Sequence, residues 1–259
     1  AVPVSLVHFL RPEKVFSSID ALRAQIETDA DAVRSMYQKT GRIRAVLFDF
    51  DDTLTKRDLS FAGGCRLFLK RHFPMLDGTA LDDAAERLTA ASHHGYLPFD
   101  RTVYDGLCKA HGVAVPFEEF SRLLQIGYPL STVVVDDARP TLEALRKRGL
   151  KLGIVTNGSA ILQNRKLDIS GLRPLFDGVT VGGEEGVDKP HAAVFERAAM
   201  RLGVPSEDCL FVGDNVKNDI EGSLDAGMQA VFVDHGYPDF PLTRPVPRIR
   251  RLTELPELI

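Results

Sequence analysis

The sequence predicts an α/β protein in which buried parallel strands alternate with helices and one long helical segment is inserted. Three observations lead to this prediction: short apolar runs bounded by turn residues, helical patterns between those runs, and one interval too long for an ordinary connection. With 259 residues, the chain is long enough for one such unit with an insertion and for a sizeable core.

Five short apolar runs have the composition of strands that are buried on both faces. They are rich in β-branched and aromatic residues, which is typical of parallel sheets. Four of them are clear, and the third in chain order is weaker. The runs cover residues 43–50, 150–157, 177–183, 208–215 and 229–236.

Helical patterns separate these runs. Residues 140–149 place Leu142 and Leu145 on one face and end in glycine, and residues 191–203 carry apolar residues in helical register from Val194 onward. This alternation predicts a Rossmann-like parallel sheet with helices on both sides. In such folds, sites form beyond the carboxyl ends of the strands.

One interval breaks the alternation. About ninety residues separate the first run from the helical pattern at 140–149, whereas the connection between two parallel strands needs only a dozen or so residues. Helical patterns at 80–94 and 116–127 lie in this interval. We therefore expect residues 60–135 to form a helical cap over the strand ends, inserted into a core made of residues 42–59 and 136–259.

Residues 1–41 are expected to form a separate leader. Apolar residues recur at helical spacing from Ile19 to Tyr37, and Ser17 or Ser18 precedes them as a cap. The pattern predicts an amphipathic helix that needs a surface to pack on.

Charge and composition exclude several classes of protein. A net charge of −4 argues against nucleic-acid binding, and we interpret the four arginines of residues 244–251 as a solvated edge. Three scattered cysteines suggest neither a disulfide framework nor a metal cluster, and they fit a reducing cytoplasm. No apolar run approaches the roughly 20 residues needed to cross a bilayer, so no membrane association is expected.

The first run ends in an unusual concentration of acid. Asp49 and Asp51 are two residues apart, so in an extended segment their side chains point toward the same space. Two carboxylates about 4 Å apart repel by roughly 4 kcal/mol at an effective dielectric of 20. Either a cation lies between them or one of them is protonated, and both arrangements suit phosphoryl transfer with Mg²⁺.

Polar residues at the other strand ends complete a candidate site. Asp214 follows the fourth run and Asp219 lies shortly after it, so both are candidate metal ligands. Thr156, Asn157 and Gly158 follow the second run and offer a hydroxyl, an amide and backbone N–H groups for phosphate oxygens.

Lys189 lies just before the helical pattern of residues 191–203. There it would bring positive charge to the nucleophile and to the transferring group. The small molecule that such a site binds is a phosphate ester, and the oligomeric state stays open.

These residues resemble the four motifs of the haloacid dehalogenase superfamily. The first motif, Asp-x-Asp-x-Thr, stands at Asp49 to Thr53, and the second is the strand that ends at Thr156. The third is Lys189, and the fourth is the Gly-Asp pair at 213–214 followed by Asp219. The resemblance covers roughly residues 43–236.

The resemblance implies a role for each of these residues. Asp49 attacks phosphorus and becomes an aspartyl-phosphate, while Asp51 protonates the leaving alkoxide and later deprotonates water. Mg²⁺ is held by the Asp49 carboxylate, the Asp51 backbone carbonyl and Asp214, with Asp219 in or near the outer shell. Thr156 binds the phosphoryl group, Lys189 steadies the charge, and the insertion is the cap that selects the substrate.

Two other classes of protein share parts of this pattern. The dehalogenases of the superfamily lack an acid at the position of Asp51, because a halide leaves without a proton, so a phosphatase is favoured. Receiver domains also use an acceptor aspartate, Mg²⁺, a threonine and a lysine. However, their acidic metal pair lies far upstream of the acceptor and they carry no inserted cap.

The leader resembles the carboxyl-terminal end of bacterial riboflavin kinases over residues 7–34, through Phe-Leu-Arg and Lys-x-Phe-x-Ser leading into a helix. No kinase activity follows, because the nucleotide and flavin sites of those enzymes lie outside this stretch. The resemblance implies FMN or a phosphorylated riboflavin precursor as a candidate substrate. Phosphoglycolate and sugar phosphates are the alternatives.

Overall fold

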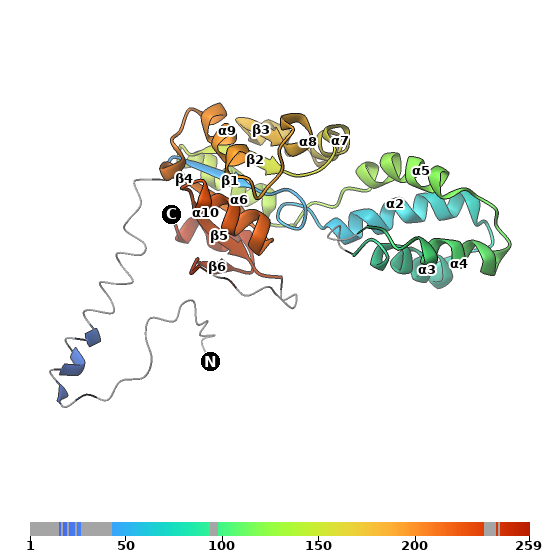
Figure 1. The fold of residues 1–259 in the computed structure, drawn as a ribbon, viewed down its shortest axis with the longest axis horizontal. Helices are drawn as coiled ribbons and strands as arrows, with labels where there is room; N and C mark the ends of the chain where they lie inside the picture. The colour runs from blue at the N-terminus through green and yellow to red at the C-terminus, as the bar shows by residue number, and fades with distance from the viewer. Residues whose placement is uncertain are drawn as a thin grey trace.

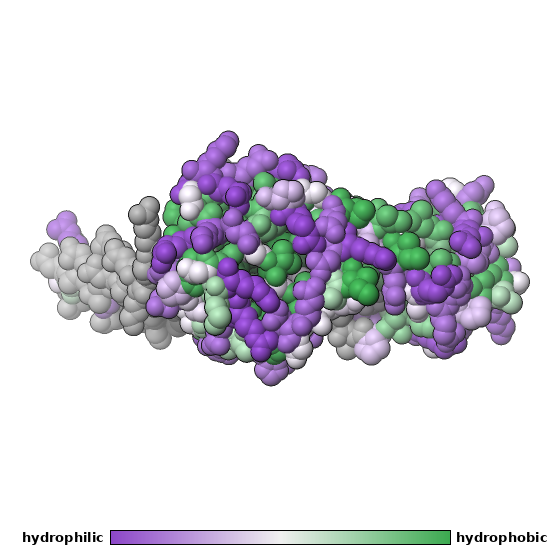
Figure 2. All heavy atoms as spheres, turned by 90° about the horizontal axis from the view of Figure 1, so that it is seen from above, coloured by the Kyte–Doolittle hydropathy of each residue, from purple (hydrophilic) through white to green (hydrophobic). Residues whose placement is uncertain are grey.

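A computed structural model describes residues 43–93, 98–235, 242 and 244–259, together with residues 16, 18, 19, 21–23, 25 and 26 of the leader. Two units lie side by side in it: an α/β core and a bundle of helices (Figure 1). Two chain segments join them. Seen from above, apolar side chains gather at the surface where the units meet (Figure 2).

The core is built on a six-stranded sheet in the order β3-β2-β1-β4-β5-β6, and every pair of neighbouring strands is parallel. All five predicted strands are present. The strands are β1 (Ala45–Phe48), β2 (Lys151–Thr156), β3 (Gly178–Val181), β4 (Cys209–Gly213), β5 (Gln229–Val233) and β6 (Arg248–Ile249).

The sixth strand corrects one expectation. The arginine-rich segment 244–251 is not simply a solvated edge, because Arg248 and Ile249 pair with β5 and both Val246 and Ile249 are buried. Three of its arginines, Arg244, Arg248 and Arg251, form ion pairs with carboxylates of the core. The alternation of apolar and basic residues is that of an edge strand with one buried face.

Alternate residues of β1 point to opposite faces of the sheet, as strand geometry requires. Val46 and Phe48 pack on one side with α6, α7 and η5, whereas Ala45 and Leu47 pack on the other side with α9. The helical elements of the core are α6 (Ala138–Lys147), α7 (Ala160–Ser170), η2 (Arg173–Leu175), α8 (Gly182–Glu185), α9 (Ala192–Leu202), η3 (Ser206–Asp208), η4 (Val216–Glu221), α10 (Gly222–Asp225) and η5 (Leu252–Glu257).

The inserted segment forms four helices around an aromatic core of its own. Phe68, Tyr104 and Phe120 are buried there with their rings in mutual contact. The helices are α2 (Arg57–His72), α3 (Gly78–Ala90), α4 (Arg101–His111) and α5 (Phe117–Leu130). We call this bundle the cap. The limits 60–135 stay a prediction, and α2 already begins at Arg57.

The two segments that connect cap and core run side by side. Backbone hydrogen bonds join Lys56 N–H to the Val133 carbonyl at 2.8 Å and Val135 N–H to the Leu54 carbonyl at 3.0 Å. A second contact between the units is made where α5 packs against α7 and Leu162 packs against the aromatic core of the cap. The position of the cap is therefore set both by the paired connecting segments and by the contact with α7.

The leader lies mostly outside the described residues. Of those described, 19, 21–23, 25 and 26 are helical, and the Ser18 hydroxyl accepts a hydrogen bond from the Ala21 N–H at 3.1 Å. This agrees with the predicted serine cap. The predicted packing of the leader and most of the stretch 7–34 fall outside the described residues. No helix of the described residues is long and apolar enough to cross a membrane.

Candidate active site

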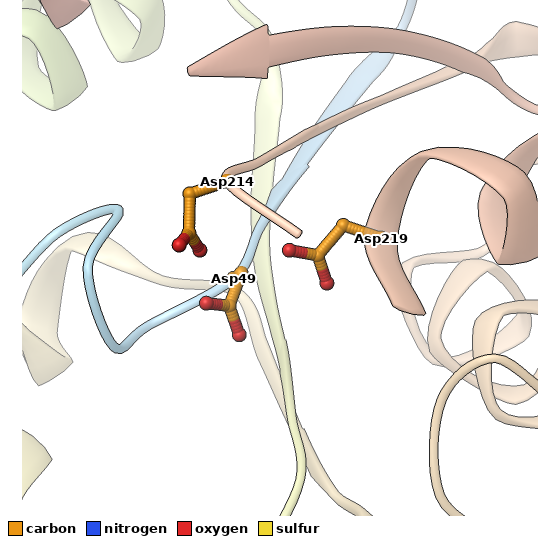
Figure 3. Close-up of side chains that lie close together, drawn as sticks. All are labelled: Asp49, Asp214 and Asp219. Carbon is orange, nitrogen blue, oxygen red and sulfur yellow. The ribbon is translucent and has the colours of Figure 1, made fainter. Parts of the chain in front are cut away.

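The topology of the sheet brings the acidic residues of the first and fourth motifs together. β1 and β4 are neighbours, with Phe48 opposite Val212, so Asp49 and Asp214 emerge at the same edge. Asp219 approaches from η4. The three carboxylates face one another (Figure 3), and one oxygen of each lies within 4.8 Å of the others.

Asp214 has the surroundings of a cation ligand. Among the described residues it forms no ion pair, and its nearest hydrogen-bonding group is the Thr53 hydroxyl at 3.5 Å. Burial, together with the charges of Asp219 and Asp49, raises the pKa of Asp214 well above its ordinary value. A partly buried carboxylate among other carboxylates is unfavourable unless a cation completes the group, and oxygen donors suit Mg²⁺. The residues present therefore fit a magnesium ion.

Lys189 joins Asp49 to the fourth motif. Its Nζ donates to Asp49 Oδ1 at 2.5 Å and to Asp219 Oδ1 at 2.7 Å. The other oxygen of Asp219 accepts the Asn215 N–H at 2.9 Å. Burial lowers the pKa of Lys189, but the charges of Asp219 and Asp49 outweigh it and hold that pKa above its usual value. Because protein groups occupy both of its oxygens, Asp219 chiefly holds Lys189 in place.

Asp49 is buried and its charge is only partly balanced. Burial raises the pKa of Asp49 to about 7, with Lys189 opposing the shift and Asp219 and Asp51 adding to it. A divalent cation beside this carboxylate favours its ionised form and lowers that pKa. A cation at this position would therefore favour the charged form of Asp49.

The Asp51 carboxylate points to the cap side of the site. One oxygen contacts Lys166 Nζ and the Tyr128 hydroxyl, the latter at 3.3 Å, and the other accepts from Gln163 Nε2 at 3.0 Å. Burial raises the pKa of Asp51, but Lys166 and Gln163 outweigh it, so that the net shift is downward. With the side chain held in this way, a metal contact from Asp51 would use its backbone carbonyl.

The side chains of the second motif are hydrogen-bonded within the protein. Thr156 Oγ1 is buried and accepts from Gln163 Nε2 at 2.7 Å. Both polar atoms of the Asn157 side chain bond the backbone of Lys189, at 2.7 and 2.9 Å, so its expected contact with phosphate falls to its backbone N–H. Gly158 has a φ of 101°, which L side chains rarely adopt.

A cavity of about 200 Å³ opens between these groups, and its lining residues are all polar or charged. The sequence analysis did not predict several residues at this site, among them Arg57, Tyr128, Gln163, Lys166 and Asn218. One signal was present in the sequence of α7. That helix buries Gln163 and Lys166 while Ile161 and Ile169 are exposed, which inverts the usual placement.

The fold and site define a Rossmann-like α/β protein with a composite acidic site and an inserted helical cap. The chain belongs to the haloacid dehalogenase-like hydrolase family, whose sequence pattern it matches over residues 43–227. The predicted resemblance is thereby confirmed. The riboflavin kinase family matches residues 1–37, mostly outside the described residues.

Individual relatives agree with this assignment. N-acylneuraminate-9-phosphatase from Homo sapiens is 30% identical and is matched over 84% of this chain and 94% of its own length. Glyceraldehyde 3-phosphate phosphatase from Methanopyrus kandleri is 40% identical over 121 residues, 42% of this chain and 52% of that protein, so the match spans about half of that relative.

A solved structure of similar fold extends over both units. It is the HAD-hydrolase YfnB from Bacillus subtilis bound to magnesium, which is 27% identical with a TM-score of 0.64. The similarity covers 84% of this chain and 99% of that one. The α/β core and the inserted helices thus occur together in a known protein.

Proposed function

We propose that the protein is a magnesium-dependent phosphomonoester hydrolase that acts through an aspartyl-phosphate on Asp49. The observation that supports this most directly is the convergence of Asp49, Asp214 and Lys189 at one edge of the sheet. A nucleophilic carboxylate, a carboxylate placed to bind a cation and a fixed ammonium group are the parts that phosphoryl transfer requires.

Asp49, Asp214 and the Asp51 backbone carbonyl would hold the magnesium ion, with Asp219 behind them. When bound, the ion neutralises negative charge on the phosphate and on the nucleophile. The similar Bacillus subtilis hydrolase is bound to magnesium, which supports this choice of metal.

In the first step, an Asp49 carboxylate oxygen attacks phosphorus. The new O–P bond forms as the ester P–O bond breaks, and Asp51 gives its proton to the leaving oxygen. Thr156, Lys189 and the backbone N–H groups of Asn157 and Gly158 bind the phosphoryl oxygens. A phosphate dianion beside Asp51 raises the pKa of that carboxyl toward the range that an acid needs.

In the second step, water attacks the phosphorus of the aspartyl-phosphate and gives one proton to Asp51. Inorganic phosphate leaves and the Asp49 carboxylate is restored. Asp51 thus acts first as an acid and then as a base. This supports ester hydrolysis over dehalogenation, because a halide leaves without a proton.

The substrate we propose is a small phosphorylated metabolite. The polar cavity of about 200 Å³ accommodates a phosphate with a short leaving group. The names of the relatives, glyceraldehyde 3-phosphate phosphatase and N-acylneuraminate-9-phosphatase, point to phosphorylated sugars and related acids. Phosphoglycolate belongs to the same size class.

A second candidate is FMN or a phosphorylated riboflavin precursor. The observation that favours it is the riboflavin kinase match at residues 1–37, which links the leader to a flavin-pathway protein. This candidate is rejected if neither compound releases phosphate under conditions in which an aryl phosphate is hydrolysed.

A phosphatase screen with Mg²⁺ tests the proposal. It covers sugar phosphates, phosphoglycolate, nucleotides and FMN, with Asp49→Asn as the blank. We expect turnover of at least one ester by the wild type and none by the variant. Full activity of Asp49→Asn would refute the mechanism, and a stable phosphoaspartate without turnover would indicate a phospho-acceptor domain.

We also propose a reducing, cytoplasmic location for the protein. The three cysteines support it, because Cys65, Cys108 and Cys209 are all free thiols. Two of them, Cys65 and Cys209, are buried and so have no access to a partner thiol.

A further inference from the structure

A fully buried lysine lies behind the active site, and the reaction steps above do not use it. Lys166, on α7, has no exposed side-chain surface. Its Nζ contacts Asp51 Oδ1, and it also donates to the Tyr128 hydroxyl at 3.0 Å. Burying an ammonium group is costly unless it is paired, so its contact with Asp51 is the reason this lysine can be buried.

Tyr128 brings the cap to the same carboxylate. It lies on α5, is buried, and places its hydroxyl 3.3 Å from Asp51 Oδ1. Its ring is also 4.6 Å from the Lys166 ammonium, as measured to the ring centroid. One oxygen of Asp51 is therefore held both by the core helix α7 and by the cap helix α5.

Gln163 fixes the other oxygen of Asp51. Its Nε2 donates to Asp51 Oδ2 at 3.0 Å and to the Thr156 hydroxyl at 2.7 Å. Both oxygens of the Asp51 carboxylate are therefore held by hydrogen bonds. Its orientation depends on α5 and α7, which pack against each other where the cap meets the core.

We propose that Lys166 and Tyr128 are positioning residues that orient the Asp51 carboxyl group toward the leaving oxygen. They also make this orientation depend on the packing of α5 against α7. The inference rests on the proposed function, in which Asp51 is the acid and base. Neither residue is among those that line the cavity. Both act through Asp51, so that the acid is in place only when the cap is seated.

A positioning role makes a distinctive kinetic prediction. An alkoxide leaving group needs the proton of Asp51, whereas 2,4-dinitrophenolate leaves without one. The value of kcat/KM reports steps up to the first irreversible one, which is phosphoryl transfer to Asp49. Loss of positioning should therefore lower kcat/KM for an alkyl phosphate much more than for 2,4-dinitrophenyl phosphate.

The experiment uses the full chain with Mg²⁺ and two variants. Tyr128→Phe removes only a hydroxyl, and Lys166→Met keeps the length of the side chain without its charge. General acid catalysis is worth about 10²–10⁴-fold. We expect Lys166→Met to lower kcat/KM for the alkyl ester by about 100-fold or more, and Tyr128→Phe by about 10-fold. With the dinitrophenyl ester, each should stay within about threefold of the wild type.

Two matched controls separate positioning from cap stability. Tyr104→Phe removes another cap hydroxyl, which donates to the Val115 carbonyl at 2.9 Å within the cap. Lys147→Met removes an exposed lysine of α6. Both controls should keep the wild-type ratio between the two esters. If Lys166→Met fails to fold, Tyr128→Phe decides the test alone.

Equal losses of kcat/KM on both esters, or no loss on either, would overturn the inference. Residues that only stabilise the contact between cap and core would affect both leaving groups alike. An inactive wild type, or an Asp49→Asn variant as active as the wild type, would instead overturn the proposed function and this inference with it.

Discussion

Both polar atoms of the Asn157 side chain form hydrogen bonds with the backbone of Lys189. Its Oδ1 accepts the Lys189 N–H at 2.7 Å and its Nδ2 donates to the Lys189 carbonyl at 2.9 Å. The residue after β2 therefore fixes the lysine that precedes α9, although 32 residues separate them. The second and third motifs thus form one hydrogen-bonded unit, in which the loop after β2 places the Lys189 ammonium group.

This relationship predicts that Asn157→Ala displaces Lys189. Misplacing a catalytic group by about 1 Å costs as much as 100-fold in rate, so we expect kcat/KM to fall by about 10- to 100-fold. Steady-state kinetics on the best ester of the screen measures it. Asn164→Ala is the control, because its side-chain amide is also hydrogen-bonded, to Ala160, Glu184 and Arg173, but outside the site. Equal activities of the two variants would contradict the prediction.

Steric crowding explains why the fourth motif has a glycine at position 213. A Cβ at Gly213 would lie 2.6 Å from Asp219 Cβ, well inside the distance at which two carbon atoms can pack. We expect Gly213→Ala to push Asp219 away from Lys189, to destabilise the fold by about 1–3 kcal/mol and to abolish activity. Thermal unfolding and the ester assay measure these effects.

The control for this variant is Gly106→Ala. Gly106 lies inside α4, with no atom within 4 Å of the added methyl group, so alanine should stabilise the helix by about 1 kcal/mol. A Gly213→Ala protein with wild-type stability and turnover would show that Asp219 does not need its present place.

The three thiols should react at very different rates. Burial raises the pKa of Cys65 to about 12, and burial with the nearby charges of Asp208 and Glu207 raises the pKa of Cys209 to about 12. Cys108 is partly exposed. Because the thiolate is the reactive form, Ellman's reagent should label one thiol of the native protein quickly. Cys108→Ser should remove that reaction, and a fast second thiol would contradict the burial described.

Much of this architecture is predictable because parallel strands are apolar on both faces, so that β1, β2, β4 and β5 are visible as continuous runs. The motif residues follow from the same rule, since they stand at the carboxyl ends of those strands. β6 escaped prediction because only Arg248 and Ile249 pair, within a segment whose composition indicates a surface.

The supporting residues of the site could not be predicted for a different reason. Tyr128 and Lys166 meet at Asp51 only because the cap packs on α7, which is a tertiary contact between segments that no local pattern joins. Asn157 illustrates the converse. Its place in the second motif can be identified from the sequence, but its hydrogen bond to the backbone of Lys189 can be identified only from the structure.

The acidic cluster makes the stability of the metal-free protein depend on pH. The pKa of Asp49 is raised from 3.8 to about 7 in the folded state, and that of Asp214 is also raised. The folded protein thus binds protons more tightly than the unfolded chain between these values. With EDTA present, stability should therefore fall as pH rises from about 4 to about 7 and the protons are lost. The melting temperature across this range measures the slope.

Magnesium should reverse this loss at pH 7, because the ion binds the folded state and favours the ionised carboxylates. A ligand at 100 times its dissociation constant stabilises by about 2.7 kcal/mol. Asp214→Asn removes one of the clustered negative charges, so this variant should melt higher than the wild type in EDTA and gain little from Mg²⁺. Asp83→Asn, at an exposed position of α3, should respond to both conditions as the wild type does. If the wild type melts at the same temperature with and without Mg²⁺, the cluster does not bind the ion in the folded protein.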